Sequence, residues 1–100
     1  MSYDVLRQAI IDRKQVTCVY RGLAREVCPH VIGLKRGKHH ALVFQFAGQS
    51  SSGLPPGGEW RCLDTDGVTG AVLRAGSWHT GDSHLKPQTC VDQIDVEVTI

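Results

Sequence analysis

The segment VTCVYRG, residues 16–22, decides the fold class. Val16, Cys18 and Tyr20 occupy alternate positions, and this period of two is typical of a half-buried β-strand. Gly22 then allows a tight turn, because glycine adopts positive φ without strain. Related strand-like segments follow at residues 25–34, 40–46, 59–63 and 94–100. We therefore predict a mainly β protein.

A short amphipathic segment, residues 3–12, precedes these strands. Val5 and Ala9 are four positions apart, and so are Leu6 and Ile10. Each pair therefore shares one face of a helix. A helix followed by about five short strands with glycine-rich turns favours a small β-barrel. At 100 residues, the chain is predicted to be one domain spanning 1–100, with its barrel strands between residues 15 and 100.

The connections between the strands have their own signals. Residues 35–38 (KRGK) predict a hairpin turn, and residues 47–58 (AGQSSSGLPPGG) a flexible loop. Pro29 cannot donate a hydrogen bond to a neighbouring strand, so we expect it at an edge, at a bulge or on an unpaired side of the strand. Residues 69–89 show no clean period, and their structure is not predicted.

The strand around residues 40–46 has two apolar faces, and one must be chosen for the core. We expect Leu42, Phe44 and Phe46 to face the core, with Ala41, Val43 and Gln45 on the opposite face. Cys18 and Cys62 are expected to act as small core hydrophobes.

Composition narrows the environment of the protein. Apolar residues make up 41% and charged residues 21%, which is typical of a globular chain. No apolar run approaches the ~20 residues that span a bilayer, and the N-terminus lacks a signal-peptide pattern. We therefore expect a cytoplasmic protein without a membrane partner, in which the four cysteines stay reduced.

Charge is unevenly distributed along the chain. Residues 13–38 carry seven basic side chains against Glu26 alone, whereas residues 59–100 carry seven acidic side chains against three basic ones. Such polarity could attract an anionic partner to one side of the domain. The alternative is that the basic residues only solvate strand edges and turns.

Catalytic and metal sites are not predicted. No C-x-x-C pair is present, and the spacing of Cys28, His30, His39 and His40 does not favour zinc. The serine-rich loop misses the G-x-S-x-G pattern, and no phosphate-binding loop or dinucleotide motif is present. We expect no enzyme activity and no cofactor.

A basic and aromatic surface is the remaining candidate site. Arginine forks match phosphate and carboxylate oxygens, and small barrels bind single-stranded nucleic acid with aromatic platforms beside a cationic track. Tyr20 is favoured as a core residue, and the roles of Arg25 and Arg61 are open between site and scaffold. The candidate ligand-binding residues are Tyr20, Arg25, His30, Lys35, Arg36, Lys38, His39, Gln45, Trp60 and Arg61.

The order of these motifs resembles a WYL-type domain. The match begins with Leu6…Ala9-Ile10…Val16-x-x-x-Tyr20…Arg25-x-Val27-x-Pro29-His30-x-x-Gly33. It continues with Leu42-Val43-Phe44-Gln45 before Gly48, and with Trp60-Arg61-Cys62-Leu63-Asp64-x-Asp66-x-Val68. The resemblance covers roughly residues 5–68. Two positions depart from the family, whose Trp-Tyr-Leu is His40-Ala41-Leu42 here and whose second arginine is Gly67.

The resemblance implies an SH3/Sm-like barrel that senses a ligand through a basic and aromatic patch containing Tyr20, Arg25 and Arg61. In bacterial transcription factors such domains usually accompany a winged-helix DNA-binding domain, which we do not expect in this chain. The leading hypothesis is a stand-alone, non-catalytic regulatory module for an anionic ligand such as a nucleotide or single-stranded nucleic acid. The alternative is a protein-interaction or homo-oligomerising barrel without such a ligand.

Overall fold

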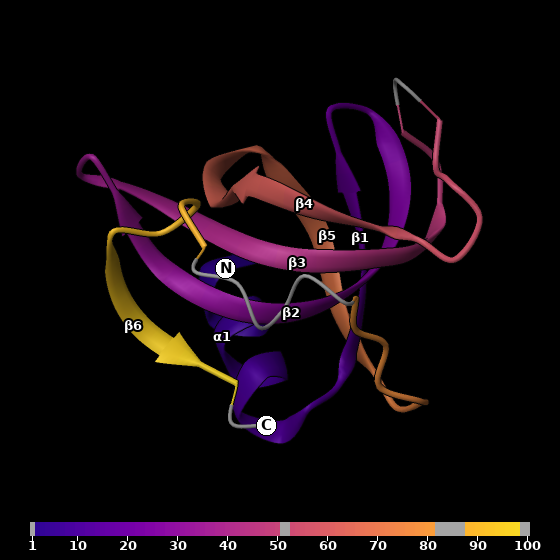
Figure 1. Ribbon diagram of the computed structural model, residues 1–100, viewed down its shortest axis with the longest axis horizontal. Coiled ribbons are helices and arrows are strands. Elements are labelled where there is room, and N and C mark those ends of the chain that lie inside the picture. Colours follow the sequence, from indigo (N-terminus) through magenta and orange to yellow (C-terminus); the bar gives the residue numbers. More distant parts are fainter. Residues whose placement is uncertain (1, 51–52, 82–87, 99–100) are drawn as a thin grey trace.

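The computed structural model describes residues 2–50, 53–81 and 88–98, and it is a mainly β structure with one helix (Figure 1). In chain order the elements are α1 (Ser2–Asp12), β1 (Gln15–Tyr20), β2 (Leu23–Lys35), β3 (Lys38–Gly48), β4 (Glu59–Asp64), the 3-10 turn η1 (Thr65–Gly67), β5 (Val68–Arg74) and β6 (Gln93–Glu97). The predicted helix and the first four predicted strands are confirmed. The fifth, predicted over residues 94–100, is confirmed as β6 as far as Glu97, and residues 99–100 lie outside the described part of the chain. The strand β5 covers the first part of residues 69–89, whose structure was not predicted from the sequence.

The strands form one antiparallel sheet in the order β4-β3-β2-β1-β5. β6 pairs with the second half of β2, next to the half that pairs with β1. β4 and β5 lie at the two ends of this order, and in the described part of the chain they do not pair with each other. The sheet is therefore not closed, and the predicted barrel is only partly matched.

A bulge in β2 sets which side chains reach each face of the sheet. The register with β3 shifts between Pro29 and Val31, so His30 is the extra residue. The prediction that Pro29 lies at an edge, at a bulge or on an unpaired side of the strand is confirmed. The predicted turn is also confirmed, since Arg36 and Gly37 both have positive φ between β2 and β3, as a tight hairpin turn requires.

The main core lies between α1 and one face of the sheet. Leu6, Ala9 and Ile10 of α1 are at most 2% exposed. They pack with apolar residues of the strands, including Val16, Cys18, Tyr20, Val27, Ile32, Ala41, Val43 and Leu63. The core positions predicted for Tyr20 and Cys18 are confirmed.

The predicted orientation of β3 is wrong. Ala41 and Val43 belong to the main core and Gln45 is fully buried, whereas Leu42 packs against a smaller cluster of Val31, Cys90 and Val91 on the other face. Both faces of this strand are covered. Hydrophobicity alone therefore could not identify the face that meets the core.

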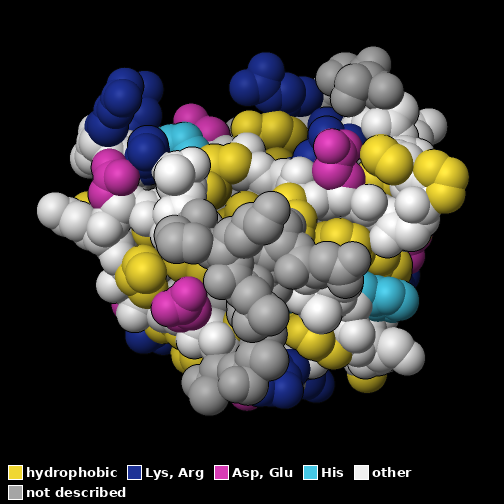
Figure 2. Space-filling model, viewed as in Figure 1, with side chains coloured by type: hydrophobic (Ala, Val, Ile, Leu, Met, Phe, Trp, Pro, Cys, Tyr) yellow, Lys and Arg dark blue, Asp and Glu magenta, His cyan; other side chains and the backbone are white. Residues whose placement is uncertain are grey.

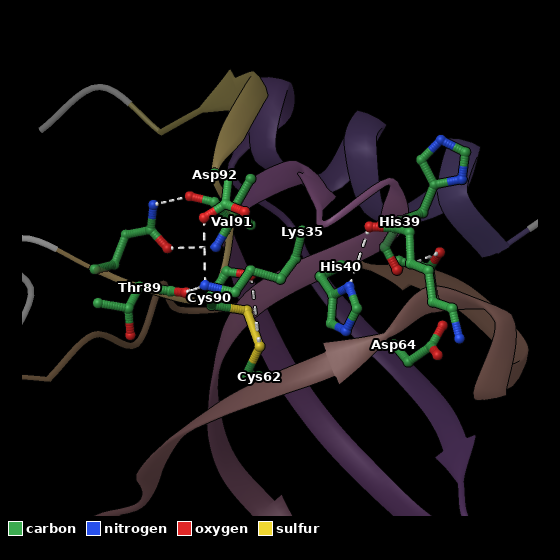
Figure 3. Close-up of a disulfide and its surroundings, with 12 residues drawn as sticks. Lys35, His39, His40, Cys62, Asp64, Thr89, Cys90, Val91 and Asp92 are labelled. Carbon is green, nitrogen blue, oxygen red and sulfur yellow. Dashed lines mark hydrogen bonds and ion pairs between the residues drawn. A yellow bond between two sulfur atoms is a disulfide. The ribbon is translucent and has the colours of Figure 1, made fainter.

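A disulfide joins Cys62 of β4 to Cys90, which precedes β6 (Figure 3). The prediction that Cys62 is a small core hydrophobe is therefore wrong. The prediction that all four cysteines stay reduced is wrong for Cys62 and Cys90. Beside the disulfide, Lys35 donates to the carbonyl of Thr89 at 2.7 Å and pairs with Asp92 at 3.3 Å. These contacts attach the chain before β6 to β4 and to the end of β2.

The helix is attached to β6 by polar contacts. Asp95 accepts a hydrogen bond from the Tyr3 hydroxyl at 2.6 Å and pairs with Arg7 at 3.1 Å. Burial, followed by the hydrogen bond to Asp95, raises the pKa of Tyr3 to about 12. Within the described residues, no helix is long and apolar enough to cross a bilayer.

Gly33 marks the closest approach of β6 to β2. A Cβ atom at this position would lie 2.0 Å from the carbonyl oxygen of Gln93 and 2.8 Å from a methyl carbon of Val91. We expect Gly33→Ala to lower the free energy of unfolding by about 2 kcal/mol, because the backbone of β6 must shift. Urea denaturation measures this, with Ala24→Gly as an exposed control that contacts no part of β6. A Gly33→Ala protein as stable as the wild type would contradict the close packing of these strands.

Candidate anion-binding site

One end of the main core is polar and positively charged. Arg25 pairs with Cys18 across β1 and β2, and Arg61 pairs with Val43 across β3 and β4. Directly opposed residues in antiparallel strands share a face. Both arginines therefore lie on the face that carries the core. We call Tyr20, Arg25, Gln45, Ser50 and Arg61 the cationic end.

Arg25 is buried among neutral groups. Only 6% of the residue is exposed. Its Nη1 donates to Gln45 Oε1 at 3.3 Å and its Nη2 to the carbonyl of Tyr20 at 3.4 Å. The guanidinium also lies 5.2 Å from the centre of the Tyr20 ring. Its Nε is buried and has no hydrogen-bond partner among the described residues.

The charge on Arg25 is poorly compensated. Burial lowers its pKa, and the nearby positive charge of Arg61 lowers it further. Within residues 2–50, 53–81 and 88–98, no carboxylate forms an ion pair with Arg25. A buried cation without a counter-ion is unfavourable. A perturbed pKa of this origin is typical of functional sites.

Arg61 connects the cationic end to the loop after β3. Its side chain is 18% exposed, and its Nη2 pairs with Glu59 at 3.0 Å. The same nitrogen donates to Ser50 Oγ at 3.1 Å and to the carbonyl of Gly53 at 3.2 Å. In the part of the chain that the structure describes, the Nε of Arg61 is buried without a hydrogen-bond partner, as in Arg25. Glu59 is half-exposed, so one solvated carboxylate accompanies two largely buried guanidinium groups.

Gln45 positions both Arg25 and the start of the loop. It is fully buried. Its Oε1 accepts from Arg25, while its Nε2 donates to the carbonyls of Ala47 at 3.1 Å and Gln49 at 2.9 Å. The amide therefore uses both of its ends. This arrangement holds the guanidinium of Arg25 beside the loop that begins at Gln49.

The basic hairpin that the sequence grouped with these residues lies elsewhere. Arg25 is near the start of β2, whereas Lys35 and Arg36 are at its far end and Lys38 begins β3. Figure 2 shows Lys and Arg side chains in separate groups at the upper and the lower edge of the molecule, and not as one continuous patch. Lys35 forms an ion pair with Asp92. The ring of His39 packs against the ring of Tyr3, with 4.6 Å between the ring centres.

His30 and Trp60 lie on the opposite face of the sheet from the cationic end. The His30 ring is fully buried, 4.6 Å from Trp60 and 4.7 Å from Trp78 between ring centres. Trp60 also meets Phe44 edge to face at 5.3 Å. The ten predicted site residues are thus divided among the cationic end, the basic hairpin and this aromatic group.

The aromatic group includes residues that the sequence analysis missed. Trp78, His79 and Thr80 follow β5 in an irregular segment, and His79 stacks on Phe46 at 4.1 Å. The sequence signal for these residues was Trp78, the second of two tryptophans, which lies in a segment without helical or strand periodicity.

The two remaining cysteines are buried thiols. Burial raises the pKa of both Cys18 and Cys28, which disfavours the reactive thiolate. In the part of the chain that the structure describes, no three His, Cys, Asp or Glu side chains are grouped to hold a metal ion.

Comparison with known proteins adds no relative. The chain matches no protein-family model, no curated protein and no solved structure.

Proposed function

We propose that this protein is a non-catalytic binding module that receives an anionic group at the cationic end. The observation that carries the proposal is the burial of Arg25 without an ion-paired carboxylate in the described residues. An anion would offset the cost of keeping that charge out of water. It would also offer an acceptor to the buried Nε atoms of Arg25 and Arg61.

The ligand class we favour carries phosphate or carboxylate oxygens. A guanidinium presents its donors in a planar fork that suits both groups, and such charge-assisted hydrogen bonds are stronger than neutral ones. A nucleotide or single-stranded nucleic acid remains our preferred natural ligand, as the resemblance to WYL-type domains implies. We also propose that the sheet is an open variant of the SH3/Sm-like barrel, which the helix-first element order and the bulged, shared strand β2 support.

Calorimetric titration at low ionic strength tests this proposal, with inorganic phosphate, AMP and a short oligothymidylate as probes. We expect at least one probe to bind, and Arg25→Gln to weaken that binding by tenfold or more, as loss of a charge-assisted hydrogen bond predicts. Arg61→Gln should have a similar effect. Lys38→Gln removes the same charge from the exposed hairpin and should change the affinity by less than about twofold.

Two outcomes would contradict the proposal. One is the absence of binding for all three probes. The other is equal weakening by Lys38→Gln and Arg25→Gln, because that result would indicate general charge attraction and no defined site.

A second candidate function is supported by exposed apolar side chains at one edge of the sheet. Val72 is 59% exposed and Leu73 36%, and both belong to the edge strand β5. Val19 of the adjacent strand β1 is 38% exposed. Such an edge suits a protein partner or a second copy of the chain. Light scattering that shows concentration-dependent mass, combined with no binding of the three anionic probes, would favour this function.

A further inference from the structure

A hollow of about 430 Å³ lies on the face of the sheet opposite the cationic end. Its walls are the rings of Phe44 and Trp60, the side chain of Thr80, and the chain at residues 56–58 and 81. None of these described lining residues is charged. The hollow is wide open to solvent, and its volume lies within the range of small-molecule sites.

Glycines bring the backbone directly against the two rings. A Cβ atom at Gly58 would lie 2.8 Å from the Phe44 ring, and one at Gly81 would lie 2.7 Å from Nε1 of Trp60. The loop before β4 and the segment after β5 therefore approach the rings more closely than any side chain would allow. These contacts restrain the rings that form the walls of the hollow.

Thr80 contributes a polar side chain to this hollow. His30 Nδ1 is 2.7 Å from the carbonyl oxygen of Cys28, and a carbonyl only accepts, so Nδ1 carries the hydrogen. In the neutral imidazole the Nε2 atom is then an acceptor, and it lies 3.0 Å from Thr80 Oγ1. With His30 neutral, the threonine hydroxyl donates its hydrogen to Nε2. The two lone pairs of its oxygen then remain to accept a hydrogen bond from a ligand.

We propose that this hollow binds an uncharged planar ring that carries an N–H or O–H donor. The rings of Phe44 and Trp60 offer flat and edge contacts to such a ligand, and Thr80 Oγ1 accepts its hydrogen bond. A charged ligand would meet no compensating side chain among the described lining residues. Indole, phenols and nucleobases belong to the class that fits.

Indole and 1-methylindole are matched probes, since methylation replaces the N–H donor with a methyl group and keeps the ring system. We expect indole to shift the amide NMR signals around Phe44, Trp60 and Thr80, with a Kd of about 1 mM or lower for a ligand of this size. 1-Methylindole should bind about fivefold more weakly, because it leaves the threonine acceptor unpaired. The probes carry no charge, so the outcome is independent of the anion site.

Variants at Thr80 separate the hydrogen bond from simple apolar contact. Thr80→Val should bind both probes with equal, weaker affinity, and Thr80→Ser should keep the preference for indole. Thr69→Val, on the exposed strand β5, is the matched control and should behave as the wild type. Unfolding midpoints of the three variants establish that each is folded. Absence of indole-induced shifts, or equal affinity of the wild type for the two probes, would overturn the proposal.

Discussion

Removing the Cys62–Cys90 disulfide will lower the free energy of unfolding by about 3–4 kcal/mol. The bond closes a loop across 28 positions of the chain, and a cross-link of that span restricts the unfolded ensemble by about this amount. Serine suits the exposed position 62 and alanine the buried position 90. Urea denaturation of the double variant Cys62→Ser/Cys90→Ala, compared with the wild type, measures the difference.

A reducing agent provides the control for this prediction. It should destabilise the wild type by nearly the same amount and leave the double variant unchanged, because the remaining cysteines, Cys18 and Cys28, are unpaired thiols. A wild type whose denaturation midpoint does not respond to reduction would contradict the pairing.

The position of the disulfide links stability to the second face of the sheet. Cys90 belongs to the small cluster with Val31 and Val91, and the backbone N–H of Asp92 donates to the carbonyl of Leu34 at 2.8 Å. Gln88 adds two hydrogen bonds of 2.8 Å to Val91. Loss of the covalent bond should therefore loosen residues 88–92 first, which hydrogen exchange can detect.

Local signals allowed most of the fold to be predicted. The helix follows from i, i+4 apolar spacing, and the hairpin turn follows from Arg36 and Gly37 between two alternating segments. The choice of core face in β3 failed because residues 75–81 and 88–92 cover its second face without any periodic pattern. When an irregular segment covers a strand, the only signal in the sequence of that strand is that both of its faces are apolar.

The candidate site was predicted only in part. Arg25, Gln45 and Arg61 were named from residue type and motif, and the structure brings them together at one end of the core. The lysines and arginine of the hairpin were grouped with these residues because they are close in sequence. Proximity in sequence is a poor guide here, because Arg25 and the hairpin lie at opposite ends of the 13-residue strand β2. His30 and Trp60 were assigned to the same surface, but the bulge and strand alternation direct them to the other face.

Inorganic phosphate will stabilise the wild type, and Arg25→Met will abolish that response. A ligand that binds only the folded state adds about 2.7 kcal/mol at a hundredfold excess over its Kd. Methionine keeps a long apolar stem in the position of Arg25 and removes the charge. Urea denaturation with and without phosphate at low ionic strength measures the effect, and Arg36→Met on the exposed hairpin should respond as the wild type does.

The phosphate-free comparison distinguishes a ligand site from a structural ion pair. Removing one partner of a compensated buried pair costs about 3–5 kcal/mol, because the other charge is left behind. Arg25 has no such partner in the described residues. Its replacement sacrifices two long hydrogen bonds, of 3.3 and 3.4 Å, but relieves an unfavourable burial of charge. The buried Gln45 Oε1 also loses its donor. We therefore expect Arg25→Met without phosphate to lower the free energy of unfolding by about 2 kcal/mol or less. A loss of several kcal/mol would identify Arg25 as scaffold and remove the principal support for an anion site.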